Sequence, residues 1–111
     1  MKNTVAIVVP CFNEEKRLPL NKFKDFSKKN PHITFCFVND GSKDNTAKII
    51  KDADLMLLDL EQNVGKAEAV RAGVTKMAQE GYDWIGFWDA DLATPLEEIP
   101  HFLAKAEGSH F

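Results

Sequence analysis

The sequence is poor in cysteine and has no long apolar run, and both scarcities narrow the class of protein. Its two cysteines, Cys11 and Cys36, are too few for a disulfide framework and lack the spacing of zinc ligands. No apolar run approaches the ~20 residues that span a bilayer, and the apolar run after Met1 is too short for a signal peptide. We therefore expect a cytoplasmic protein with reduced thiols, which would reach the cytoplasmic face of a membrane only through residues outside this chain.

Positive charge is not in excess either. The 14 Lys and Arg residues are outnumbered by 17 Asp and Glu, which gives a net charge of −3, whereas nucleic-acid-binding domains are usually basic. A hydrophobic content of 44% is ordinary for a soluble globular domain, and 111 residues leave room for one such domain with a small pocket. These numbers argue against a nucleic-acid partner and for a single domain.

Strand-like and helix-like segments alternate along the chain. Strands are predicted at 4–9, 33–38, 55–60 and 84–88. Helices are predicted at 19–29, from a cap at Asp44 or Asn45 through Asp52, between Gly65 and Gly81, and at 96–105. This alternation predicts an α/β fold of three layers, α/β/α, in which a mainly parallel sheet has helices on both faces.

Some details of these elements are specific expectations. Pro10 should end the first strand, and the apolar segment 84–88 should be a buried strand. Thr94 and Pro95 have the pattern of an N-cap followed by the first residue of the last helix. The third helix should bury one apolar stripe, formed by Ala67, Val70, Val74 and Met77.

The tripeptide Asp89-Ala90-Asp91 follows the last predicted strand directly. Burying either carboxylate without a partner would cost at least several kcal/mol. A divalent cation bound to a diphosphate would resolve this conflict, because hard cations take oxygen ligands and sit between carboxylate and phosphate. The pair therefore favours an enzyme that handles a nucleoside diphosphate.

Polar residues follow all four predicted strands, in the segments 10–15, 39–42, 63–66 and 89–91. The carboxyl ends of parallel strands share one edge of the sheet, which is where ligands bind in open α/β folds. The opposite edge, at 30–32 and 80–83, has ordinary turn residues. Four such loops at one edge predict a binding site there.

Four segments also carry a family resemblance: 10–15 (PCFNEE), 38–46 (VNDGSKDNT), 63–73 (NVGKAEAVRAG) and 89–95 (DADLATP). They resemble glycosyltransferase family 2, in particular the polyprenyl- and dolichyl-phosphate sugar synthases. The resemblance implies a Rossmann-like GT-A fold. It also implies an inverting, metal-assisted hexosyl transfer from a UDP- or GDP-sugar to an acceptor such as polyprenyl phosphate or a glycan.

The resemblance further implies a role for each matching position. Pro10, Phe12 and Glu14 would line the base pocket, Asp40 would hydrogen-bond the base, and Asp89 would contact the ribose or the diphosphate. Asp91, together with Asp89, would hold Mg²⁺ or Mn²⁺. The remaining residues of the expected nucleotide-sugar site are Asn13, Gly41, Lys66 and Arg71, of which the two cations would lie near the diphosphate or the sugar.

The chain departs from the family pattern in three ways. Ala93 stands where related enzymes often have a glutamine that helps to ligate metal, and Asn39 replaces a frequent aspartate. The acceptor-side base of the family lies beyond Phe111. We therefore expect residues 1–111 to be the nucleotide-sugar-binding part of a catalytic domain truncated at its C-terminus. Such a part would bind donor without transferring sugar, and its exposed sheet edge would favour homo-oligomers.

Other interpretations stay open at this point. The main alternative function is a non-catalytic nucleotide-binding or protein-interaction module. A haloacid-dehalogenase phosphatase is disfavoured because its Asp-x-Asp motif should follow the first strand, and a sugar nucleotidyltransferase because residues 10–15 contain no glycine. Locally, Phe12 could be a hydrophobic staple, 40–42 a plain turn and Asn63 only a helix cap, while Glu15 is expected to be a solvated acid in the first turn of the first helix.

Overall fold

A computed structural model of the chain describes residues 4–108. The elements are β1 (Val5–Cys11), α1 (Leu20–Lys29), β2 (Ile33–Asp40), α2 (Thr46–Asp52), β3 (Met56–Leu60), α3 (Lys66–Gln79), β4 (Trp84–Phe87) and α4 (Glu98–Gly108). The strands form one sheet in the order β3-β2-β1-β4, and every neighbouring pair is parallel. Across residues 4–108, no helix has the length and apolar character needed to cross a bilayer.

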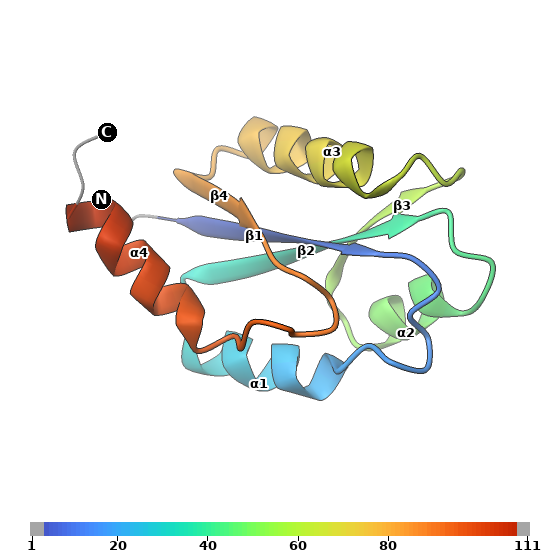
Figure 1. The fold of residues 1–111 in the computed structure, drawn as a ribbon, viewed down its shortest axis with the longest axis horizontal. Coiled ribbons are helices and arrows are strands. Elements are labelled where there is room, and N and C mark those ends of the chain that lie inside the picture. The colour runs from blue at the N-terminus through green and yellow to red at the C-terminus, as the bar shows by residue number, and fades with distance from the viewer. Residues whose placement is uncertain (1–3, 109–111) are drawn as a thin grey trace.

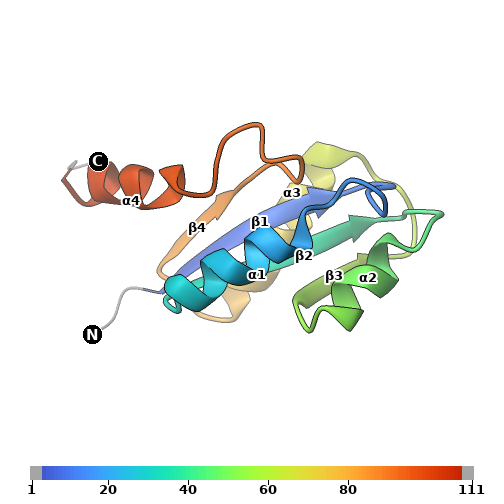
Figure 2. The same cartoon turned by 90° about the horizontal axis from the view of Figure 1, so that it is seen from below.

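Helices cover both faces of the sheet, so the predicted three-layer architecture is confirmed (Figures 1 and 2). Alternate residues of β1 point to opposite faces: Ile7 and Val9 join the core beneath α1, α2 and α4, while Ala6 and Val8 face α3. On the α1 side, the ring of Phe23 packs edge-on against Phe35 and Phe37, both at 5.1 Å between ring centres. Both faces of the central strands are therefore buried.

Pro10 does not end the first strand, as the sequence predicted, because β1 continues to Cys11. Pro10 pairs in register with Val38 of β2, whereas the pairing of β1 with β4 stops at Val8. The carbonyl of Val8 accepts a hydrogen bond from Trp88 of the β4 side. Since backbone groups alternate in direction along a strand, the position of the missing N–H of Pro10 faces beyond the end of β4, where no ladder bond is lost.

The apolar stripe of α3 differs from the prediction at its N-terminal end. Ala67 is exposed, and the buried residues are Ala69, Gly73 and Met77, with Val74 packed beside them. A Cβ at Gly73 would lie 2.5 Å from a methyl carbon of Val8. The helix therefore contacts the sheet through backbone at this point, which turns its buried face away from Ala67.

Two predictions about the last elements are wrong. α4 begins at Glu98, because residues 95–99 first form turns closed by bonds from Glu98 N–H to Pro95 and from Ile99 N–H to Leu96. β4 is only partly buried, and Phe87 is 53% exposed. The reason is topological: β4 pairs with β1 alone and is an edge strand, which an apolar composition does not reveal.

Candidate functional site

A cleft of about 420 Å³ lies at the carboxyl ends of the strands. Successive strands are added to one side of β1 up to β3, and β4 is then added to its other side, so the strand order reverses between β1 and β4. Ligands of open parallel sheets bind at such a switch point. The cleft is lined by Pro10, Cys11, Phe12, Glu14, Asp40, Asn63, Gly65, Lys66, Asp89, Ala90 and Asp91. The structure thus brings together seven predicted site residues, from all four loops: Pro10, Phe12, Glu14, Asp40, Lys66, Asp89 and Asp91.

Asp40 ends β2 and is 3% exposed. Its carboxylate accepts hydrogen bonds from the N–H of Val64 at 2.7 Å, the N–H of Gly65 at 3.1 Å and Nδ2 of Asn63 at 3.1 Å. A carboxylate offers about four acceptor positions. Asp40 therefore orders the β3–α3 loop and keeps capacity for one further donor in the cleft.

The residues beside Asp40 have structural tasks. Asn39 Nδ2 donates to Asp59 of β3 at 2.7 Å, and Asn39 Oδ1 accepts from the N–H of Ser42 at 3.2 Å. A Cβ at Gly41 would lie 2.3 Å from the backbone nitrogen of Asn63. Glycine at this position allows the loops after β2 and β3 to touch, and Gly41 itself lies outside the cleft lining.

Lys66 is the first residue of α3 and reaches across the cleft to the end of β4. Its Nζ lies 2.6 Å from Oδ1 of Asp89 and 6.0 Å from the centre of the Phe87 ring. Both partners of the ion pair are about half exposed, at 62% and 46% of their side chains. The pair therefore has ready access to solvent, and its charges are free to exchange partners with an ionic ligand.

Asp91 is exposed, and its Oδ1 accepts a hydrogen bond from the N–H of Ala93 at 3.0 Å. The turn from Asp89 to Leu92 is closed by a bond of 3.1 Å, and Leu92 has φ +56°. Residues 4–108 contain no group of three or more side chains that could form a metal cage on their own. Two carboxylates on one turn fit instead the mode in which Mg²⁺ takes one or two carboxylates and completes its shell with phosphate oxygens and water.

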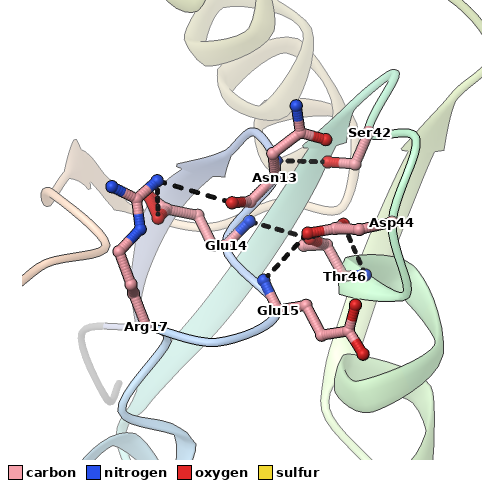
Figure 3. A network of polar contacts seen from close by, with 7 residues as sticks. All are labelled: Asn13, Glu14, Glu15, Arg17, Ser42, Asp44 and Thr46. Carbon is pink, nitrogen blue, oxygen red and sulfur yellow. Dashed lines mark hydrogen bonds and ion pairs between the residues drawn. The ribbon is translucent and has the colours of Figure 1, made fainter.

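The β1–α1 loop forms one wall of the cleft with Phe12 and Glu14; Figure 3 shows Glu14 among its neighbours in this loop. The ring of Phe12 is 43% exposed, so it is available to a ligand rather than buried as a staple. Glu14 pairs with Arg17 at 2.9 Å, and Arg17 also bonds the carbonyl of Asn13 at 3.4 Å. The same arginine thus holds two consecutive residues of this wall.

The remaining predicted residues lie outside the cleft lining. Asn13 binds the β2–α2 loop, and the exposed Arg71 pairs with Glu68 on α3 at 3.9 Å. Glu15 is not a solvated acid of the first helix, because α1 begins only at Leu20 and both Glu15 oxygens accept hydrogen bonds from Asn45. The sequence analysis missed the contact of Asn63 with Asp40, although an amide in the loop after β3 was a signal for it.

Comparison with known proteins gives the family. The sequence profile of "Glycosyl transferase family 2" matches residues 6–110. The chain is 34% identical over 114 residues to undecaprenyl-phosphate 4-deoxy-4-formamido-L-arabinose transferase of Proteus mirabilis (strain HI4320), covering 95% of this chain and 34% of that protein. It is 35% identical over 109 residues to bactoprenol glucosyl transferase of Shigella phage SfV, covering 91% and 34%. The chain thus spans about a third of the length of these relatives.

Solved structures have the same fold. Mannosyltransferase PcManGT from Pyrobaculum calidifontis, in complex with GDP-Man and Mn²⁺, matches with a TM-score of 0.69 at 19% identity, over 88% of this chain and 30% of that one. Glucosyl-3-phosphoglycerate synthase from Mycobacterium tuberculosis, in complex with Mn²⁺, UDP and glucosyl-3-phosphoglycerate, matches with a TM-score of 0.68 at 23% identity. This match covers 95% of this chain and 39% of that one. These matches confirm the predicted GT-A fold. Because the family profile covers residues 6–110, nearly the whole chain, this chain belongs to glycosyl transferase family 2.

Proposed function

We propose that this chain is the donor-binding part of an inverting glycosyltransferase that moves a sugar from a UDP- or GDP-sugar to a lipid-phosphate or glycan acceptor. The observation that carries the proposal is the single cleft in which Phe12, Asp40, Lys66, Asp89 and Asp91 meet at the carboxyl ends of the strands. Family membership supports a polyprenyl-phosphate acceptor, and so do the names of the two relatives, one an undecaprenyl-phosphate sugar transferase and the other a bactoprenol glucosyl transferase.

The chain's own residues divide the donor along the cleft. The exposed face of Phe12 offers a surface for stacking the base, and the free acceptor capacity of Asp40 suits a base N–H. Lys66 at the N-terminus of α3 follows the loop that Asp40 binds, and it offers its charge to the diphosphate. Binding of a diphosphate would exchange the partner of Lys66 and release the carboxylate of Asp89.

Asp91 and Asp89 are the residues that would hold a divalent metal ion. When bound, Mg²⁺ or Mn²⁺ supplies Lewis-acid stabilisation of the charge that develops on the leaving nucleoside diphosphate. The PcManGT and glucosyl-3-phosphoglycerate synthase complexes, which contain Mn²⁺, support this choice of ion. We place the acceptor and its catalytic base outside the third of the relatives' length that this chain matches, so the chain alone is expected to bind donor without turnover.

Titration calorimetry tests the proposal. UDP and GDP are titrated into the chain with Mn²⁺, with Mg²⁺ and with EDTA, using Asp91→Asn as the test variant. Loss of a carboxylate that meets a cation should cost about 1–3 kcal/mol, which weakens metal-dependent binding on the order of tenfold to a hundredfold. Asp25→Asn, an exposed carboxylate on α1, is the matched control and should leave the affinity unchanged.

The same titration distinguishes donor binding from the alternative function, a protein-interaction module. Such a module would give no heat with either nucleotide in the presence of metal, and Asp91→Asn would change nothing. Absence of heat with wild-type chain would therefore reject donor binding. Binding that EDTA and Asp91→Asn leave intact would reject only the metal site.

A further inference from the structure

Two loops that lie far apart in the sequence are bonded to each other beside the cleft (Figure 3). We name this set of contacts the loop clamp; it joins residues 13–15 of the β1–α1 loop to residues 42–46. The N–H of Asn13 donates to Ser42 Oγ at 2.9 Å, and Asn13 Oδ1 accepts from the N–H of Lys43 at 3.0 Å. Asn13 thus binds two successive residues of the other loop, Ser42 through its backbone N–H and Lys43 through its side-chain oxygen.

Thr46 and Asp44 form the other half of the loop clamp. The N–H of Glu14 donates to Thr46 Oγ1 at 2.9 Å, and the N–H of Glu15 donates to Asp44 Oδ2 at 3.2 Å. The Thr46 hydroxyl donates in turn to Asp44 Oδ1, which also accepts the N–H of Thr46 at 3.0 Å. This bond from the Thr46 hydroxyl lowers the pKa of Asp44, which favours the ionised, accepting form.

The segment held by the loop clamp is the one that presents Phe12 and Glu14 to the cleft. Its conformation is unusual, because Asn13 has φ +52°, in the left-handed region that non-glycine residues rarely adopt. Asparagine tolerates this region better than most residues, and its hydrogen bonds to Ser42 and Lys43 fix Asn13 in it. Thr46 is fully buried beneath the loop, and neither Thr46 nor Asp44 lines the cleft.

We propose that Thr46 and Asp44 are positioning residues for nucleotide binding: through the backbone of Glu14 and Glu15 they hold the base-side wall of the cleft in its binding shape. The inference rests on the proposed function, since it assigns the β1–α1 loop to the donor. The inference goes beyond the proposed function because it gives a role in binding to two side chains that do not line the cleft.

Two variants isolate the hydroxyl of Thr46. Thr46→Val keeps the size of the side chain but leaves the N–H of Glu14 without its acceptor, whereas Thr46→Ser keeps the hydroxyl. Phe26→Leu, on the buried face of α1, controls for a general loss of stability. Asp44→Ala provides a second, exposed position at which the chain should fold normally. Each variant is measured for UDP affinity with Mn²⁺ and for the hydrogen-exchange rate of the Glu14 amide by NMR.

The inference predicts that Thr46→Val and Asp44→Ala bind UDP about tenfold more weakly, a change typical of one lost hydrogen bond. The UDP affinities of Thr46→Ser and Phe26→Leu should stay within about twofold of wild type. The Glu14 amide should exchange faster in Thr46→Val, but not in Thr46→Ser or Phe26→Leu. If wild type and Thr46→Val bind UDP with equal affinity, this inference is overturned while the proposed function stands. Failure of wild type to bind any nucleotide would overturn the proposed function and this inference with it.

Discussion

Cys11 lies at the cleft, yet the structure gives its thiol the environment of a core residue. The side chain is 1% exposed, and Sγ contacts the carbonyl of Val9 at 3.6 Å. Burial, and to a smaller extent the negative charge of Glu14, raise the pKa of the Cys11 thiol from 9.0 to about 12. The thiolate is the reactive form of cysteine, so Cys11 is not a nucleophile at neutral pH.

This assignment predicts the response of Cys11 to alkylation and to alkaline pH. Iodoacetamide should label Cys11 only after unfolding, as measured by mass spectrometry with and without urea. Because the folded pKa is raised, the stability linked to the Cys11 proton is fully present below pH 9.0 and is lost as the pH rises toward about 12. Urea unfolding of Cys11→Ala should therefore lack part of the alkaline decline of wild type. Rapid labelling of the native chain would contradict the prediction.

Single residues also show where sequence reasoning reached the site. The carboxylates at 40, 89 and 91 could be predicted because each lies at or shortly after the end of an apolar strand, and parallel strands bring their ends to one edge. The hydrogen-bond partners could not be predicted in the same way. Whether Asp40 bonds Val64 and Gly65, or whether Glu15 reaches Asn45, depends on loop conformation over more than twenty residues of separation.

At the scale of elements, the contact between the β2–α2 and β3–α3 loops depends on Gly41. This residue has φ +66°, and a Cβ there would meet the backbone of Gln62 and Asn63 at 2.5 and 2.3 Å. Gly81 has a similar φ of +90°, but a Cβ at Gly81 would meet nothing within 4 Å. Both glycines therefore need a positive φ, but only Gly41 lies in close contact with another segment of backbone.

Replacing each glycine with alanine separates these two effects. Gly81→Ala should cost about 1–2 kcal/mol, the usual cost of a left-handed non-glycine residue. Gly41→Ala should cost about 1–3 kcal/mol more through overpacking, and it should also weaken UDP binding because the displaced loop carries Lys66. Urea unfolding and calorimetry measure the two quantities. Equal unfolding free energies for the two variants would show that the loops do not need to touch.

The elements themselves were predictable in type and order, because hydrophobic periodicity is a local property. The exceptions depend on neighbours in space: β1 passes through Pro10 since β4 is too short to pair there, and α3 buries Gly73 since its backbone meets Val8. The start of α4 at Glu98 follows from two turns that compete with a helix beginning at Pro95. Local sequence does not record these tertiary effects.

At the scale of the whole molecule, the two edges of the sheet differ in protection. β3 carries Asp59, which forms an ion pair with Lys51 at 3.9 Å, whereas the four residues of β4 include no charge and no proline. The N–H groups of Trp84 and Trp88 donate to Thr4 and Val8 on the β1 side. By alternation, the backbone groups of Ile85 and Phe87 point away from the rest of the sheet.

An unprotected apolar edge is a template for pairing with a second strand. We therefore expect this 111-residue chain to self-associate through β4, with an increase in mass on raising its concentration in sedimentation or light-scattering experiments. Phe87→Pro should keep the chain monomeric without loss of fold, because it removes only an N–H that faces outward, together with a ring that is 53% exposed. Gly86→Pro is the matched control and should unfold the chain, since the N–H of Gly86 faces β1.

A wild-type chain that stays monomeric at every concentration would contradict this prediction and show that the edge is protected by its own twist or side chains. Association that survives Phe87→Pro would place the contact elsewhere.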